Sequence, residues 1–201
     1  MENKPVIENR QRKNMSYDRL ESALGTTGKL TPQAVEFEEA VLGAIMLDDN
    51  ALSSVVDFMD PKMFYVEANQ YIYDSIIKLY TLSQPVDLLT VTNQLRKDKL
   101  LDVVGGASYL AALTNRVSSA ANVEYHARVV MEKFVLREMI SNCTSIINDA
   151  YDDSQDVVKL MDEAETKIFN IIENNFKRDS KPLNQVVKSA LQELEALRDS
   201  D

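Results

Sequence analysis

The chain has 201 residues, 45% of them apolar and 27% charged, a composition that excludes a peptide-sized binder and a chain disordered throughout. Its 32 acidic and 22 basic side chains give a net charge of -10, which argues against autonomous binding of nucleic-acid phosphates. A single Cys and a single His exclude an internal disulfide and a zinc site of paired Cys and His. No apolar run is long enough for a membrane span, so we expect a soluble protein of the reducing cytoplasm.

Residues 1–31 predict a flexible tail, because they are polar, show no sustained hydrophobic period and include two glycines near their end. Six basic and four acidic side chains give this tail a net charge of +2. Because the whole chain has a net charge of -10, the remaining residues carry a net charge of -12.

Low counts of Gly and Pro, 5 of each, favour helices over a turn-rich β fold. We expect Thr31 to cap a first helix with Pro32 at its first position, and apolar side chains recur on one face of that helix between 41 and 46. Asp48 and Asp60 are expected to cap two shorter elements, the second of them followed directly by a proline.

Segment 69–80 has a broad apolar stripe and is predicted to be the central helix of the first domain. Pro85 interrupts the helical pattern, and Asp87 restarts it with apolar residues at 88, 91 and 95. Two glycines at 105 and 106 predict a loop before a short helix over 108–113.

The second half of the chain predicts two long helices. Residues 121–151 contain no Gly or Pro, the acidic stretch 152–156 predicts a turn, and a second helix follows over 157–172. Two long helices joined by a short polar link are expected to fold back as an antiparallel hairpin. The apolar face of the first helix is expected at Val123, Ala127, Val130, Phe134, Met139, Ile146 and Ile147.

Residues 177–182 predict a charged linker, and residues 183–198 predict a last helix with apolar side chains along one face. Such a regular apolar face is typical of a helix that docks in the groove of a partner protein. The same pattern is equally consistent with a helix that packs back onto the chain's own hairpin. The candidate partner-binding residues on this face are Leu183, Val187, Leu191 and Leu194.

No catalytic, cofactor-binding or metal-ligating residue is predicted. His126 lies in a helical segment with no strained nucleophile turn before it, and we interpret it as a surface or partly packed side chain. Cys143 in the same segment is interpreted as a small core side chain, and paired carboxylates as solvated or capping groups. Segment 25–30 lacks the first glycine and the final hydroxyl residue of a phosphate-binding loop, so no ATP site is predicted.

The order of five motifs resembles the N-terminal domain of DnaB-type replicative DNA helicases. Residues 31–48, TPQAVEFEEAVLGAIMLD, resemble the signature that opens this domain. Four shorter motifs follow in the family's order: DPKMFY at 60–65, PVDLLTV at 85–91, GGASYL at 105–110 and SSAANVEY at 118–125. The resemblance covers about residues 31–198.

The resemblance implies an all-α fold with a helical head over 32–117, a hairpin over 118–176, a linker over 177–182 and a linker helix over 183–198. It also implies a collar, usually a trimer of dimers, that assembles a hexameric helicase. Primase would bind the hairpin surface, and the helicase loader would bind the linker-helix region. The linker helix itself would pack on the ATPase domain of the neighbouring subunit.

The sequence reaches Asp201 before any Walker A loop, so we expect no ATPase activity from this chain. ATP and Mg would bind in the ATPase domain of the full-length protein, which would unwind DNA and contact DNA mainly through that domain. Two other interpretations stay open: a free-standing helical adaptor that shares the domain, and a small helical enzyme with an unrecognised site.

Overall fold

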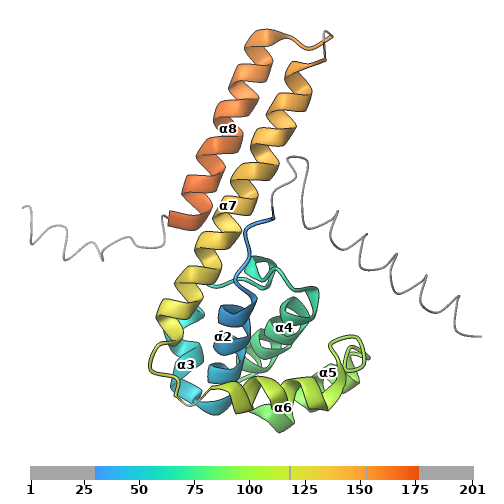
Figure 1. Cartoon of the computed structure of the whole chain (residues 1–201), viewed down its shortest axis with the longest axis vertical. Helices are drawn as coiled ribbons and strands as arrows, with labels where there is room; N and C mark the ends of the chain where they lie inside the picture. The colour runs from blue at the N-terminus through green and yellow to red at the C-terminus, as the bar shows by residue number, and fades with distance from the viewer. Residues whose placement is uncertain (1–29, 118, 153, 177–201) are drawn as a thin grey trace, which may run out of the picture.

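A computed structural model describes residues 30–117, 119–152 and 154–176. Within these ranges the chain forms α-helices and one short 3-10 helix, without strands, which confirms the all-α prediction (Figure 1). The order is α2 (Val35–Leu47), α3 (Asp49–Val55), η1 (Pro61–Met63), α4 (Glu67–Thr81), α5 (Leu88–Lys97), α6 (Gly106–Arg116), α7 (Val123–Ala150) and α8 (Val157–Phe176). We call the elements from α2 to α6 the head, and α7 with α8 the hairpin, which projects from the head as a rod.

The central helix of the head is α2, which contacts α3, α4, α6 and α7. Residues 41–46 of α2 are all buried, so this stretch is enclosed on every side. The segment predicted as central forms α4, which packs on α2, α5 and η1 and leaves Tyr80 exposed, so that prediction was wrong. Gly43 allows α6 to approach α2 closely, because a Cβ atom at this position would lie 2.3 Å from the carbonyl oxygen of Leu113.

Three aspartates begin helices where the sequence predicted. The carboxylates of Asp48 and Asp60 each accept a hydrogen bond from the N–H two residues further on, at 2.9 and 3.0 Å. Asp87 forms a reciprocal capping box with Thr90, in which each side chain accepts from the other residue's N–H. All three caps involve groups within three residues of one another, which is why sequence alone finds them.

The fourth predicted helix start, Thr31 with Pro32, was wrong. Helix α2 begins at Val35, and its N-cap residue, Ala34, has no side chain that could accept a capping hydrogen bond. The physical reason is a contact from a distant helix, because Arg137 of α7 donates to the carbonyl oxygen of Pro32 at 2.9 Å. This contact ties the segment before α2 to α7 and leaves it outside the helix.

Arg137 also connects the hairpin to the head. Its second terminal nitrogen donates to the carbonyl oxygen of Met63 at 2.7 Å. The guanidinium carbon lies 5.6 Å from the ring centroid of Tyr65 and 5.8 Å from that of Phe134. Burial lowers the pKa of Arg137 from its usual value, and a nearby glutamate opposes this effect. One side chain of α7 therefore holds both η1 and the segment that precedes α2.

A buried carboxylate organises the interior of the head. Glu38 of α2 is 1% exposed, and it accepts hydrogen bonds from the N–H of Tyr65 at 2.6 Å and of Val66 at 3.2 Å. The side-chain amide of Asn69 donates to the same carboxylate at 2.9 Å. Val66 is the N-cap residue of α4 and has no capping side chain, so Glu38 satisfies this helix terminus from a different helix. The Tyr109 hydroxyl donates to Asn69 at 2.9 Å, and burial raises the pKa of Tyr109 to about 12.

Helix α7 belongs to both parts of the molecule. Over its first half, Val123, Ala127, Val130 and Phe134 are buried and the helix packs on α2, α3 and η1, as the apolar pattern predicted. Its second half leaves the head and runs antiparallel to α8 (Figure 1). The predicted hairpin is therefore confirmed.

Several predictions lie outside the described residues. They are residues 1–29 of the tail predicted over 1–31, the linker over 177–182 and the last helix over 183–198, which carries Leu183, Val187, Leu191 and Leu194. For that last segment, docking on a partner and packing on the hairpin both stay predictions.

Candidate interaction surface on the helical hairpin

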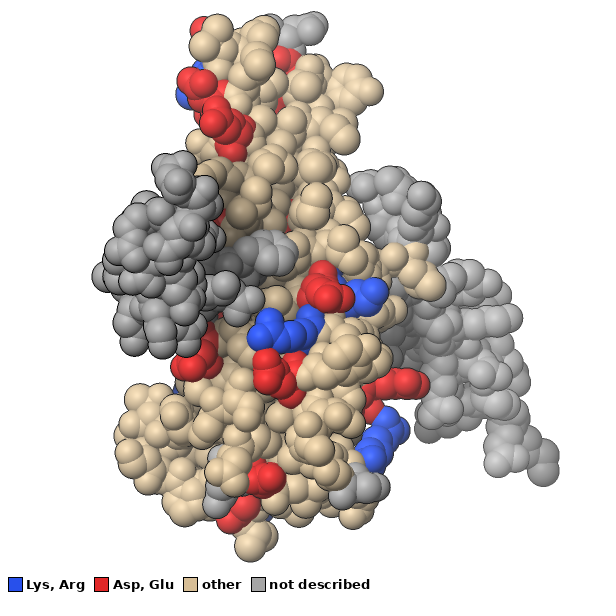
Figure 2. Space-filling view, turned by 90° about the vertical axis from the view of Figure 1, so that its left-hand side faces the viewer, with Lys and Arg blue, Asp and Glu red and all other residues tan. Residues whose placement is uncertain are grey.

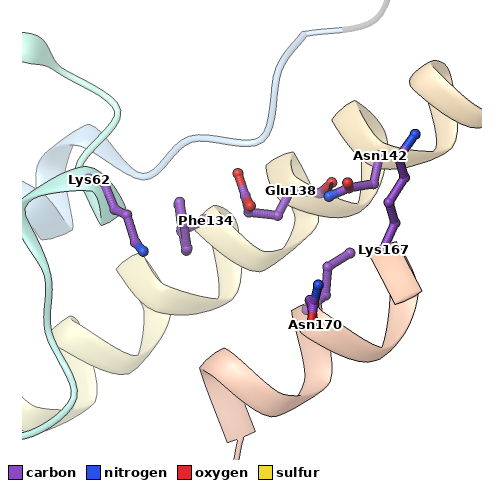
Figure 3. A pocket seen from close by; sticks show the side chains of 7 residues that line it. Lys62, Phe134, Glu138, Asn142, Lys167 and Asn170 are labelled. Carbon is purple, nitrogen blue, oxygen red and sulfur yellow. Dashed lines mark hydrogen bonds between the residues drawn. The ribbon is translucent and has the colours of Figure 1, made fainter. Parts of the chain in front are cut away.

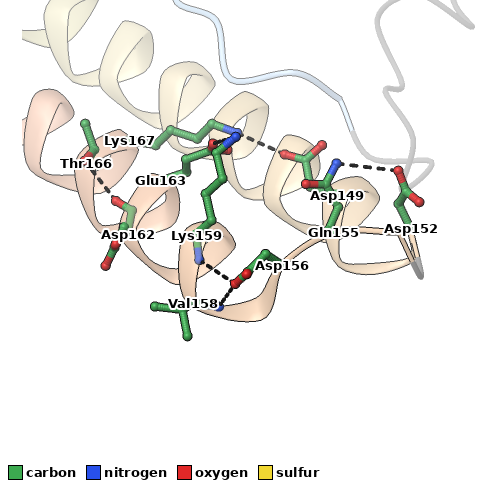
Figure 4. Close-up of polar contacts among 10 residues, drawn as sticks. All are labelled: Asp149, Asp152, Gln155, Asp156, Val158, Lys159, Asp162, Glu163, Thr166 and Lys167. Carbon is green, nitrogen blue, oxygen red and sulfur yellow. Dashed lines mark hydrogen bonds and ion pairs between the residues drawn. The ribbon is translucent and has the colours of Figure 1, made fainter.

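The crevice between α7 and α8 is largely polar. Lys167 of α8 donates to the hydroxyl of Ser145 at 3.0 Å and pairs with the carboxylate of Asp149 at 3.1 Å (Figure 4). Nearer the head, the two helices and η1 enclose a cavity of about 170 Å³. Figure 3 shows the side chains that line it: Lys62, Phe134, Glu138, Asn142, Lys167, Asn170 and Ile171. Polar side chains of α7 therefore line much of the contact between the two helices.

Apolar side chains on the second half of α7 point away from this crevice. Residues 136, 140, 143 and 147 recur at helical spacing, and Ile140 in the middle of the series is 51% exposed. Met139 and Ile147, which the sequence placed on a continuous apolar face with Phe134, are exposed to solvent instead. We define the α7 stripe as Leu136, Met139, Ile140, Cys143 and Ile147.

Cys143 lies within the α7 stripe and is exposed. The interpretation of this residue as a small core side chain was therefore wrong. The sequence indicates that the Cys143 side chain is apolar, but it does not indicate which side of α7 is covered. Helix α8 packs against the polar side of α7, so Cys143 faces solvent.

Helix α8 carries apolar side chains both toward α7 and toward solvent. Ile171 is buried and Leu160 and Ala164 are half-buried, whereas Met161 on the adjoining face is 68% exposed. We define the α8 stripe as Val157, Met161, Ile168 and Ile172, all of them exposed. Figure 2, which views the molecule from the side of α8, shows few charged side chains over much of the hairpin shaft. A monomeric soluble protein rarely exposes so long an apolar surface, so these two stripes are the candidate interaction surface.

The far end of the hairpin is acidic. Asp156 begins α8 by accepting hydrogen bonds from the N–H groups of Val158 and Lys159 at 2.9 and 3.3 Å (Figure 4). Hydrogen bonds from the hydroxyl and the N–H of Ser154 hold the pKa of Asp152 below its usual value. Residues 138–173 contain nine acidic and two basic side chains, so the surface around the stripes is strongly negative.

The structure places His126, the one histidine, as a half-buried side chain whose ring centroid lies 5.4 Å from that of Phe37. This packing confirms its interpretation as a partly packed residue. Within the described part of the chain, no cluster of three or more His, Cys, Asp or Glu is arranged to hold a metal ion. None of the helices in that part is both long and apolar enough to span a bilayer.

Comparison with known families supports a specific assignment. The model of the family described as DnaB-like helicase N terminal domain matches residues 30–132. The replicative DNA helicase DnaB of Rhodothermus marinus is 42% identical over 170 residues, which make up 85% of this chain and 18% of that protein. The DnaB of Geobacillus stearothermophilus is 38% identical over 173 residues, or 86% of this chain and 38% of that protein. The chain therefore spans well under half the length of these relatives.

Solved structures share the fold. The crystal structure of the N-terminal domain of DnaB helicase from Mycobacterium tuberculosis is 35% identical, with a TM-score of 0.66 over 69% of this chain and 98% of that chain. A DnaB-like replicative helicase, described together with its interactions with primase, has a TM-score of 0.63 at 24% identity. It covers 81% of this chain and 36% of that chain, and at this identity it supports the fold alone.

Proposed function

The chain belongs to the DnaB-like helicase N-terminal domain family, and from this premise we propose that it is the collar module of a hexameric replicative DNA helicase. In this role it holds subunits together and offers a surface to other replication proteins in the cytoplasm. The division into a head over 32–117 and a hairpin over 118–176 is part of the proposal. Unwinding, ATP and Mg binding and most DNA contact belong to an ATPase domain of the full-length protein.

The two exposed apolar stripes of the hairpin are the observation that carries this proposal. Two hairpins that pack stripe against stripe would form a four-helix arrangement with an apolar core. Burying the eight exposed apolar side chains of the two stripes other than Cys143 on each copy, at about 1 kcal/mol each, contributes about 16 kcal/mol. This exceeds the roughly 4–15 kcal/mol that association costs in lost freedom of motion. Self-association through the hairpin is therefore energetically reasonable.

Sedimentation velocity across a range of concentrations tests the self-association. We expect the mass to rise to at least that of a dimer. Ile140→Asp on the α7 stripe and Met161→Asp on the α8 stripe should each weaken association at least about tenfold, because a carboxylate would have to be buried among apolar side chains. Both residues are exposed in the single chain, so neither substitution should disturb its helix content.

Ser141→Asp is the matched control, because Ser141 is exposed on α7 but lies outside the α7 stripe. It should leave association unchanged. A mass of one chain at every concentration, or equal effects of Ile140→Asp and Ser141→Asp, would contradict the proposed role of the stripes.

Partner recruitment is the second part of the proposal. Primase is proposed as a partner of the hairpin surface, because the chain belongs to the family of DnaB-like helicase N-terminal domains and its hairpin exposes two apolar stripes. The loader and the neighbouring ATPase domain are proposed to contact segment 183–198, whose candidate residues are Leu183, Val187, Leu191 and Leu194. Isothermal titration calorimetry of the chain with the cognate primase tests the proposed binding of primase. An absence of binding at high micromolar concentration would remove primase from the proposal.

A further inference from the structure

The segment before α2 enters the head alongside α7. Figure 1 shows the first described residues descending beside α7, in the direction opposite to that helix, before α2 begins. The bond from Arg137 to the carbonyl oxygen of Pro32 holds this path beside α7 at the level of Leu136, where the α7 stripe begins. The described chain therefore begins beside α7, close to the level at which the α7 stripe starts.

The tail has the length and the side chains to cover that stripe. Tyr17, Leu20 and Leu24 are spaced three and four residues apart, which would place three apolar groups on one side of about two helical turns. The stripe residues from Ile140 to Ile147 have the same three- and four-residue spacing. Residues 25–29 include two glycines and can span up to about 17 Å, about the rise of α7 from Leu136 to Ile147.

Charge favours the same arrangement. Arg10, Arg12 and Lys13 precede the apolar residues of the tail, and the tail has a net charge of +2. If Leu24 lies near Ile140 and the segment continues antiparallel to α7, these basic residues reach the acidic end of the hairpin, about 12 residues further along both segments. That end carries Asp149, Asp152 and Asp156 (Figure 4).

We propose that residues 10–24 dock along the α7 stripe of their own chain, antiparallel to α7, with Leu20 and Leu24 on the apolar side chains and the basic residues at the acidic end. The tail then occupies part of the surface that a second copy would use. Docking of the tail is therefore expected to weaken self-association through the hairpin, and this consequence rests on the proposed function. The docking itself does not depend on the proposed function.

Cys143 provides a direct probe, because it is exposed on the stripe and is the single cysteine of the chain. Its rate of labelling by a maleimide is measured on the full chain at a concentration where sedimentation shows single chains. Leu20→Asp should raise this rate about tenfold, because burial of a leucine on the stripe is lost. Ser22→Asp is the control, since Ser22 is opposite the apolar side of the segment, and it should leave the rate unchanged.

A disulfide between an introduced and the native cysteine tests the geometry. Under mild oxidation, the cysteine of Leu20→Cys should form an intrachain disulfide with Cys143, which mass spectrometry of the digested chain would identify. In the control variant Asn3→Cys, the corresponding disulfide should form much more slowly. Equal labelling rates for wild type, Leu20→Asp and Ser22→Asp would overturn the proposal. A bond found only between chains would also overturn it and would assign the segment to a second copy.

Sedimentation of Leu20→Asp separates this inference from the proposed function. If both hold, this variant labels faster at Cys143 and associates more tightly than wild type. If the hairpin does not mediate association, the faster labelling persists without any change in mass. If the tail does not dock, association is the same in the variant and in wild type.

Discussion

Replacement of Glu38 by Ala is expected to destabilise the head strongly, because one carboxylate satisfies three donors in the interior. Two of these donors are the backbone N–H groups of Tyr65 and Val66 at the start of α4, and the third is the amide of Asn69. Glu38 is 1% exposed, so water cannot take its place without opening the contact between α2 and α4. The substitution leaves all three donors without their acceptor.

The magnitude follows from the cost of buried unsatisfied groups. Each abandoned donor costs about 1–3 kcal/mol, and partial rearrangement around Asn69 offsets some of the total. We therefore expect a loss of about 4 kcal/mol in the free energy of unfolding, equivalent to a fall of about 12 °C in Tm for a chain of this size. Such an effect is several times that of an average surface substitution.

Thermal and urea unfolding followed by circular dichroism measure this loss. Glu36→Ala is the matched control, because Glu36 lies in the same first turn of α2 but is exposed. It should cost less than about 1 kcal/mol. If Glu38→Ala and Glu36→Ala unfold within 1 °C of each other, the assignment of Glu38 as the cap of α4 is refuted.

Three further substitutions test other parts of the head. Gly43→Ala should cost at least about 2 kcal/mol in urea unfolding, because its Cβ would meet the Leu113 carbonyl oxygen at 2.3 Å and push α6 away; unchanged stability would contradict this close approach. Asp87→Ala should cost about 1 kcal/mol at pH 7. Hydrogen bonds, chiefly from the N–H of Thr90, lower the pKa of Asp87, so this stabilisation is present above the ordinary value of 3.8 and is lost as the pH falls below it. The difference between the variant and wild type in urea titrations should thus shrink as the pH falls below 3.8, and a constant difference would refute the cap. Tyr73→Phe should raise stability by about 1 kcal/mol, since this buried hydroxyl has no partner among the described residues; a lower Tm would argue for an unseen partner.

Local interactions made much of the fold predictable. The caps formed by Asp48, Asp60 and Asp87 join atoms no more than three residues apart, so residue type and spacing indicate them. The long helical segments followed from the scarcity of Gly and Pro, and the hairpin followed from two such segments with a short acidic link. These predictions do not depend on which helices pack against one another.

Predictions that depended on distant contacts were less successful. The start of α2 was misplaced because Arg137, more than a hundred residues away, holds Pro32. The apolar character of Cys143 gave no indication of whether the residue faces α8 or solvent, and the decisive contact is polar, between Lys167 and Asp149. Periodicity identifies an apolar face of a helix but not the neighbour that covers it. For segment 183–198 the neighbour stays a prediction.

The continuity of α7 has a mechanical consequence. This helix has 28 residues and passes from the interior of the head to the end of the rod without a proline or glycine to serve as a pivot. From Arg137 to Ala150 it acts as a lever of about 20 Å, so tilting the head by about 10° would displace the far end by about 3.5 Å. If several copies form a ring, as the proposed function requires, a small rotation of each head would move the far ends of the hairpins by several ångströms. The width of the ring's opening would change accordingly.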